Sequence, residues 1–123
     1  MRKHKTVAVL GASKKEERYS NMAVSRLLKD GYATIPINPT ECEIHGIKSI
    51  ANIADIECDV DILTMYVNAN RSAELADDII DLQPRKIIFN PGAENEELAE
   101  LCRENDIETE NACTLVLLNL GEL

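Results

Sequence analysis

Residues 7–21, VAVLGASKKEERYSN, decide the fold. Four apolar residues run directly into Gly11, which predicts a strand buried on both faces of a parallel sheet and ended by a tight turn. A polar loop then leads into a helical pattern, which Ser20 or Asn21 can cap. This order of strand, loop and helix is typical of nucleotide-binding folds. The dinucleotide fingerprint G-x-G-x-x-G is nevertheless absent, because Gly11 stands alone.

The alternation of strand and helix continues along the chain. Further strands are expected at 33–37, 60–67, 86–89 and 106–109, with helices at 20–31, 49–54, 94–105 and from Asn70 or Ser72 to Pro84. Pro36 is expected near a strand end, because it has no N–H to give to a sheet. The apolar stretch 115–120 is expected to cover the sheet or an interface. These elements predict one α/β domain over residues 1–123, a Rossmann-like three-layer fold with a five-stranded parallel sheet in the order 3-2-1-4-5.

The charge of the chain is strongly negative and unevenly spread. The formal net charge is −9, and the chain has one Phe, three Tyr and no Trp, which argues against a nucleic-acid partner. Eight basic side chains nevertheless lie within residues 1–29, beside two acids: Arg2, Lys3, Lys5, Lys14, Lys15, Arg18, Arg26 and Lys29. This basic corner suggests a small anionic ligand, and an incidentally basic terminus on an acidic protein is equally consistent with the pattern.

No targeting, membrane or metal-binding pattern is found in the sequence. Residues 1–6 lack the apolar region of a secretory signal, and no apolar run approaches the roughly 18 residues of a membrane span, so a cytoplasmic protein is expected. The four cysteines, Cys42, Cys58, Cys102 and Cys113, form no C-x-x-C pair, which excludes zinc ribbons and thioredoxin-like motifs. All four are expected to be buried thiols, and Cys113 is read as a packed thiol rather than a reactive one.

Four segments that follow strands are expected to meet at one edge of the sheet. They are 11–13, 38–39, 66–68 and 90–92, and the carboxyl-end crevice of such a sheet is where ligands bind. In the first segment, Gly11 allows a tight turn and Ser13 adds a hydroxyl near the free N–H groups of a helix start. Lys14, Lys15 and Arg18 can add charge-assisted contacts to a phosphate. The loop therefore predicts a phosphate site, with an ordinary tight turn as the alternative.

The end of the second strand speaks against NAD. A typical NAD site places an acidic residue there to accept hydrogen bonds from the ribose hydroxyls. This chain has Asn38-Pro39 instead, and the missing second and third glycines remove the close approach to a dinucleotide. A P-loop is excluded as well, since no G-x-x-x-x-G-K-[ST] spacing occurs.

Four motifs in order resemble the small stand-alone CoA-binding domain family, which is related to the N-terminal domain of the succinyl-CoA synthetase alpha subunit: VAVLGASKKEERYSN, TIPINP, ILTMYV and IIFNPGAENEELAE. The resemblance covers about residues 5–117. It implies a Rossmann-like fold that binds CoA or an acyl-CoA at the strand ends, and no catalytic residue is expected. It places Gly11, Ala12, Ser13, Lys14 and Arg18 near the phosphates, Ser20 at the helix start, Asn38 and Pro39 beside the adenosine, Val67 and Asn68 after the third strand, and Asn90, Pro91 and Gly92 towards the pantetheine arm.

The chain also departs from that family and its relatives. The ligase alpha subunit has a second domain with a phosphorylated histidine, whereas His4 and His45 lie in no recognisable phospho-acceptor setting, so ligase activity is not expected of this chain. The stretch NPGAENEEL replaces the more usual aromatic-Gln-x-Gly pattern at the pantetheine side.

Two other functions remain open at this stage. An atypical NAD(P)-binding oxidoreductase would use Lys14, Lys15 and Arg18 on a 2′-phosphate, but no Tyr-x-x-x-Lys pair is present. An accessory subunit of an acyl-CoA ligase, or a homodimer, would use the apolar LVLLNL stretch as its contact surface. Arg71 is a minor candidate for a phosphate or adenine contact, and a surface ion pair with Glu74 is the favoured reading.

Overall fold

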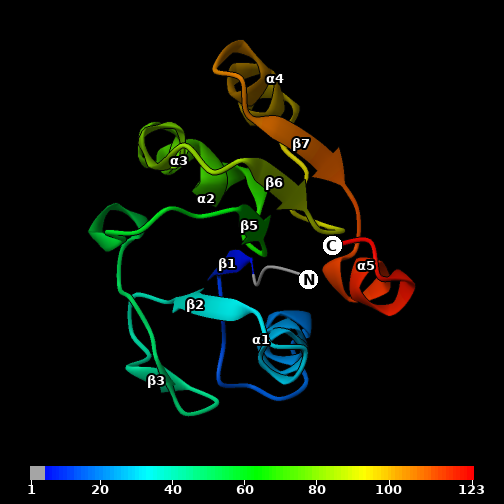
Figure 1. The fold of residues 1–123 in the computed structure, drawn as a ribbon. Helices are drawn as coiled ribbons and strands as arrows, with labels where there is room; N and C mark the ends of the chain where they lie inside the picture. Colours follow the sequence, from blue (N-terminus) through cyan, green and yellow to red (C-terminus); the bar gives the residue numbers. More distant parts are fainter. Residues whose placement is uncertain (1–4) are drawn as a thin grey trace.

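The computed structural model describes residues 5–123, so Arg2, Lys3 and His4 of the sequence analysis lie outside the described residues. Five parallel strands form one sheet in the order β2-β1-β5-β6-β7 (Figure 1). Their bounds are β1 Thr6–Leu10, β2 Ala33–Ile37, β5 Ile62–Met65, β6 Lys86–Phe89 and β7 Glu108–Asn111. The predicted parallel sheet is therefore confirmed.

The sheet has the predicted five parallel strands, but the third of them lies elsewhere than predicted: numbered by the predicted strands, the order is 2-1-3-4-5. The strand expected at 60–67, here β5, pairs with β1 on the side opposite β2. Outside β2, within residues 5–123, there is only an isolated parallel bridge between Ile37 and Ile50. Pro36 is the fourth of the five residues of β2, near the strand end as expected.

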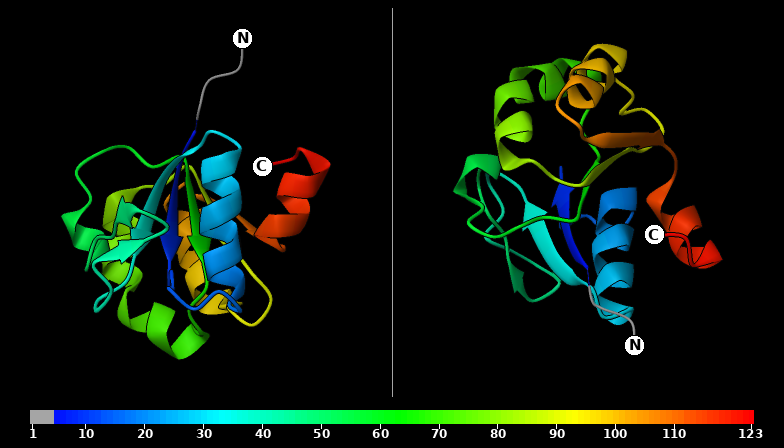
Figure 2. Two further views of the ribbon diagram at one scale, coloured as in Figure 1. Left: turned by 90° about the horizontal axis from the view of Figure 1, so that it is seen from below. Right: turned by 45° about the horizontal axis from the view of Figure 1, so that its top comes forward.

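Helices cover both faces of the sheet. On one face lie α1 Tyr19–Lys29 and α5 Thr114–Leu120, and on the other lie α2 Ala69–Glu74, α3 Ala76–Leu82, α4 Glu96–Glu104 and the short 3₁₀ helix η1 Ile53–Asp55 (Figures 1 and 2). Successive side chains of a strand alternate between faces, so Val7 and Val9 join the core under α1 and α5, while Ala8 and Leu10 join the other core. Both faces of β1 are therefore dry, as its apolar run predicts.

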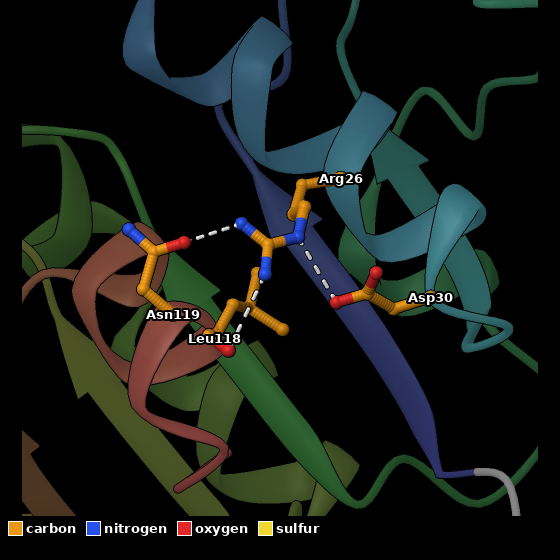
Figure 3. Close-up of polar contacts among 4 residues, drawn as sticks. All are labelled: Arg26, Asp30, Leu118 and Asn119. Carbon is orange, nitrogen blue, oxygen red and sulfur yellow. Dashed lines mark hydrogen bonds and ion pairs between the residues drawn. The ribbon is translucent and has the colours of Figure 1, made fainter.

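The carboxyl-terminal helix α5 is fastened to α1, so the apolar stretch 115–120 covers the sheet. Leu117 and Leu118 are buried in the same core as Val24 of α1. The guanidinium of Arg26 crosses between the helices, with Nη1 donating to Asn119 Oδ1 at 2.5 Å and Nη2 donating to Leu118 O at 3.4 Å (Figure 3). Its Nε forms an ion pair at 3.0 Å with Asp30, the residue that caps the end of α1.

Several helices differ from the predictions, and the one expected at 49–54 is reduced to the short 3₁₀ helix η1, Ile53–Asp55. The helix expected from Asn70 or Ser72 to Pro84 is divided at Leu75 into α2 and α3, and it starts earlier because Asn68 Oδ1 accepts the N–H of Arg71 at 2.9 Å. Helix α1 starts at Tyr19 with Arg18 in the cap position and no side-chain cap. Ser20 and Asn21, expected as caps, are instead buried in the first turn.

The segment between β2 and η1 contains a small antiparallel hairpin that the sequence analysis treated as a loop. It pairs β3 Glu43–Ile44 with β4 Ile47–Lys48. The connecting residues His45 and Gly46 have φ values of 52° and 77°, the left-handed pair that a tight hairpin turn requires. In the described part of the chain, none of the helices has the length and apolarity needed to cross a membrane.

Candidate ligand-binding site

The loop after β1 passes very close to the segment after β5, and Gly11 makes this possible. Its φ is 89°, and an added Cβ would lie 3.0 Å from Val67 Cγ1 and 3.1 Å from the carbonyl carbon and oxygen of Tyr66. The N–H groups of Gly11 and Ala12 both donate to Ile37 O at 3.2 Å, which ties the loop to the end of β2 as well. Only glycine tolerates both this φ and this closeness, so three strand ends meet at Gly11.

Two asparagines hold the loop in place. Asn38 Nδ2 donates to Ala12 O at 2.7 Å, while its Oδ1 accepts the N–H groups of Thr40 and Glu41 at 2.7 and 2.9 Å. Asn21 Nδ2 donates to Ser13 O at 2.8 Å. The amide of Asn38, expected beside an adenosine, is thus committed to the backbone around it.

His45 reaches the same loop from the hairpin, a contact that the sequence analysis did not foresee. Its Nε2 lies 2.8 Å from Asn21 Oδ1. Because Nδ2 of Asn21 already faces a carbonyl, Oδ1 is the acceptor and Nε2 of His45 carries the proton. The turn itself was predictable, because His45-Gly46 stands between the apolar residues Ile44 and Ile47. Nothing in this local sequence indicates that His45 contacts Asn21.

The loop presents cations and free N–H groups at the start of α1. Lys14, Lys15 and Arg18 are exposed, and none of them takes part in an ion pair within residues 5–123. Ser13 Oγ accepts the N–H of Lys15 at 3.1 Å. The N–H groups of Tyr19 and Ser20, in the first turn of α1, find no acceptor in the described part of the chain. The combination suits an anion, because backbone donors and positive side chains lie within one short segment, residues 14–20.

A small apolar hollow of about 50 Å³ lies beside the loop. Leu10, Ile37 and Ile53 supply its apolar lining, and Gly11, Pro39, Val67, Asn52, Arg71 and Asp78 also line it. Three of the predicted site residues, from the ends of β1, β2 and β5, are therefore brought together here. Arg71 forms the expected surface ion pair with Glu74, with 3.0 Å between Nη1 and Oε1.

The end of β6 is organised around a buried asparagine. Asn90 is 2% exposed, and its Nδ2 donates to Thr64 Oγ1 at 2.7 Å and to Met65 O at 2.9 Å. Its Oδ1 accepts the N–H of Thr114 at 2.8 Å, and the hydroxyls of Thr64 and Thr114 lie 2.7 Å apart. The side chain of Asn90 thus joins three elements inside the protein, whereas Pro91 and Gly92 after it are exposed.

Tyr66, just beyond β5, carries the one buried side-chain polar atom without a hydrogen-bond partner among residues 5–123. The hydroxyls of Thr64 and Thr114 lie near its Oη but not in hydrogen-bonding geometry. Burial raises the pKa of Tyr66 to about 12, and the Cys113 thiol adds to the rise while the two threonine hydroxyls reduce it. The place of Tyr66 after the strand was predictable from the sequence, but this unpartnered hydroxyl was not.

The cysteines only partly follow the expectation of buried thiols. All four are free, but only Cys102 is buried, and burial raises its pKa. Cys113 is half-buried at the start of α5, whereas Cys42 and Cys58 are exposed because they lie in loops outside the two cores. No group of three or more His, Cys, Asp or Glu side chains within residues 5–123 is arranged to hold a metal ion.

A family model for the CoA binding domain matches residues 5–119. The chain belongs to this family. "Uncharacterized protein YneT" of Bacillus subtilis is 29% identical over 105 residues, covering 85% of this chain and 77% of that protein. An ADP-forming acetate–CoA ligase of Methanocaldococcus jannaschii is 42% identical over 64 residues, covering 51% of this chain but 9% of the ligase. The crystal structure of an uncharacterized protein is similar, with a TM-score of 0.93 at 38% identity, covering 99% of this chain and 100% of that chain.

The residues of this member of the CoA-binding domain family fit a CoA-type ligand. CoA combines an anionic diphosphate with an adenine ring and a long neutral arm. The exposed cations of the loop after β1 suit the diphosphate, and the apolar hollow at Pro39 and Val67 suits the edge of the adenine ring. Gly11 connects these two places, because it lines the hollow and begins the loop that carries the cations.

Proposed function

We propose that this chain binds CoA or an acyl-CoA at the carboxyl ends of its strands and catalyses no reaction by itself. The observation that carries the proposal is the crossing at Gly11, which joins a cationic loop to an apolar hollow at one edge of the sheet. His45 is engaged by Asn21 within the fold, and we assign no catalytic residue.

Each part of the ligand has a proposed contact. The diphosphate lies at Gly11, Ala12, Ser13, Lys14 and Arg18, with Ser20 at the start of α1, and the adenosine lies between Asn38-Pro39 and Val67-Asn68. The pantetheine arm passes towards Asn90, Pro91 and Gly92. Since the amides of Asn38 and Asn90 are committed to the fold, both residues act by shaping the backbone that the ligand meets.

Isothermal titration calorimetry with CoA, acetyl-CoA, NAD and NADP tests the proposal. We expect saturable binding of both CoA species that weakens as salt is raised, because phosphate contacts with exposed cations are screened. A variant with Lys14, Lys15 and Arg18 replaced by Gln should lose at least about tenfold in affinity, since charge-assisted hydrogen bonds contribute more than neutral ones.

The matched control replaces Lys29 and Lys48 by Gln, two exposed lysines outside the loop, and should bind like the wild type. A response to NAD or NADP with none to any CoA species would overturn the proposal and favour the NAD(P)-binding oxidoreductase instead.

A second candidate is a CoA-binding subunit that serves an acyl-CoA ligase. The ligase from Methanocaldococcus jannaschii contains a segment 42% identical to this chain, while this chain spans 9% of that protein. Val116 and Leu120 on α5 are 50% and 62% exposed, and these apolar side chains offer a contact surface for a partner or for a second copy. Analytical ultracentrifugation of the wild type and Leu120→Asp tests this, because a monomer in both samples removes the case for a homodimer.

The same proposal includes a cytoplasmic location. Free thiols at all four cysteines, two of them exposed, are the state that a reducing compartment maintains. Fractionation of cells that express a tagged full chain, with a periplasmic or secreted marker beside it, tests the location directly.

A further inference from the structure

Arg71 is the only cation in the lining of the hollow beside Gly11, as far as residues 5–123 show. It shares this lining with Pro39 from the end of β2 and Val67 from the end of β5. Arg71 is therefore separate from the cationic loop 14–18 and lies where the proposed function puts the adenosine. A guanidinium presents two parallel donors that match a phosphate, so its position at an adenosine site indicates recognition of a phosphate on the adenosine.

The end of β2, on the other side of the hollow, offers no cation. Asn38 has both ends of its amide engaged, and the residues that follow are Pro39, Thr40 and Glu41. A phosphate on the ribose would meet no free side-chain donor from Asn38 and no cation among residues 38–41. Recognition of such a phosphate therefore falls to the segment after β5, where Arg71 stands.

The present partner of Arg71 is easily exchanged. Its pair with Glu74 joins side chains that are 50% and 68% exposed, and such pairs contribute little because water and salt screen them. A phosphate dianion carries more charge than a carboxylate and competes well for the same guanidinium. Two carboxylates act against it, Glu74 as the present partner and Asp78 in the lining of the hollow.

We propose that Arg71 recognises a phosphate on the ribose of an adenosine ligand, namely the 3′-phosphate that distinguishes CoA from dephospho-CoA. The inference rests on the proposed function, because it assigns one part of the same ligand. It adds that Glu74 holds Arg71 until the phosphate takes its place. Glu74 then sets how strongly the site discriminates between ligands with and without this phosphate.

Calorimetric titrations with CoA and dephospho-CoA test the proposal, since these ligands differ only in the 3′-phosphate. The wild type should prefer CoA by about tenfold, in line with one charge-assisted contact at a half-exposed site. Arg71→Gln should lower the affinity for CoA to that for dephospho-CoA and leave dephospho-CoA unaffected. Glu74→Gln should increase the preference for CoA, because Arg71 loses its competing partner.

Arg85→Gln is the matched control. Arg85 is also exposed and paired with a carboxylate, Asp61, but it lies just before β6 at the opposite edge of the sheet. It should keep the wild-type ratio of affinities. Titrations with NADP and NAD are a further test. If the wild type binds no CoA but prefers NADP to NAD, and Arg71→Gln abolishes this preference, Arg71 recognises a 2′-phosphate. That result would overturn the CoA assignment.

The two failures are distinguishable. Absence of binding for both CoA and dephospho-CoA would contradict the proposed function. Equal binding of the two ligands by the wild type, or an unchanged ratio in Arg71→Gln, would overturn the role of Arg71 and leave CoA binding standing. Should Arg71→Gln prove unfolded by circular dichroism, the wild-type ratio and the shift in Glu74→Gln decide the question.

Discussion

The same dipeptide, Asn-Pro, follows two strands of the sheet, Asn38-Pro39 after β2 and Asn90-Pro91 after β6. In both places the asparagine amide bonds to backbone of neighbouring elements. The surroundings differ, because Asn38 is half-buried at the rim of a hollow, whereas Asn90 is 2% exposed inside a network of hydroxyls. Identical sequence at equivalent topological positions thus gives one asparagine side chain that water can reach and one that it cannot.

Removing the two amides should separate the two sites most strongly. Asn90→Ala removes the acceptor of the Thr114 N–H and the donor to the hydroxyl of Thr64, both inside the protein. We therefore expect a loss of about 3 kcal/mol in the free energy of unfolding. Asn38→Ala should lose about 1 kcal/mol, because water can replace the amide at the exposed N–H of Thr40. Urea unfolding measures both.

Asn70→Ala is the control for these two variants, since Asn70 is exposed and makes no side-chain hydrogen bond within residues 5–123. Its stability should stay within about 0.5 kcal/mol of the wild type. Equal losses at positions 38 and 90 would contradict the contrast in burial on which the comparison depends.

The glycines beside the two asparagines extend the comparison. Gly11 and Gly92 have nearly the same φ, 89° and 91°. A Cβ added to Gly11 would lie only 3.0 Å from Val67 Cγ1, whereas one added to Gly92 would have no other atom within 4 Å. Gly92→Ala therefore measures backbone strain alone, about 1 kcal/mol. Gly11→Ala adds the collision with Val67 and Tyr66, and we expect about 2–3 kcal/mol in total. Similar losses for both would show that the crossing of the two loops can open without cost.

The contrast between local and distant partners also explains what the sequence could predict. Buried strands were predictable from apolar runs such as 7–10, because a parallel sheet covered on both faces leaves no polar position. Gly11 was predictable as a turn, and Pro39 and Val67 as neighbours across the crevice, because strand ends of a parallel sheet share one edge. Their contacts with CoA remain predictions.

The partners of polar side chains were not predictable in the same way. Asn21 was expected to cap α1, but tertiary packing buries it against Ser13 and His45, which are far apart in the sequence. The break at Leu75 has a similar cause, because residues 70–84 keep a helical apolar pattern across it and no glycine or proline marks the division. Propensity and periodicity describe single elements, whereas these features depend on which elements meet.

At neutral pH the effect expected at Tyr66 is as small as that at Asn38 and opposite in sign; Tyr66 follows β5, the strand between β1 and β6. Its buried hydroxyl has no partner within residues 5–123, so Tyr66→Phe removes an unsatisfied group and should raise the free energy of unfolding by about 1 kcal/mol at pH 7. The difference should grow at high pH. The folded phenol keeps its proton to a pKa of about 12, while the unfolded one loses it near 10. Between these values the unfolded state binds fewer protons, so wild-type stability falls as pH rises, by about 2.7 kcal/mol in all and by about half of that up to pH 11.

Urea unfolding of wild type and Tyr66→Phe at pH 7, 9 and 11 measures this difference, and comparing the two proteins at each pH cancels the contributions of all other groups, which both proteins contain. A loss of stability in Tyr66→Phe at pH 7 would mean that the hydroxyl is bonded and that the network around Asn90 is larger than Thr64 and Thr114. A constant difference from pH 7 to 11 would mean that water reaches the phenol. The end of β5 would then resemble the surroundings of the half-buried Asn38 more than those of the buried Asn90.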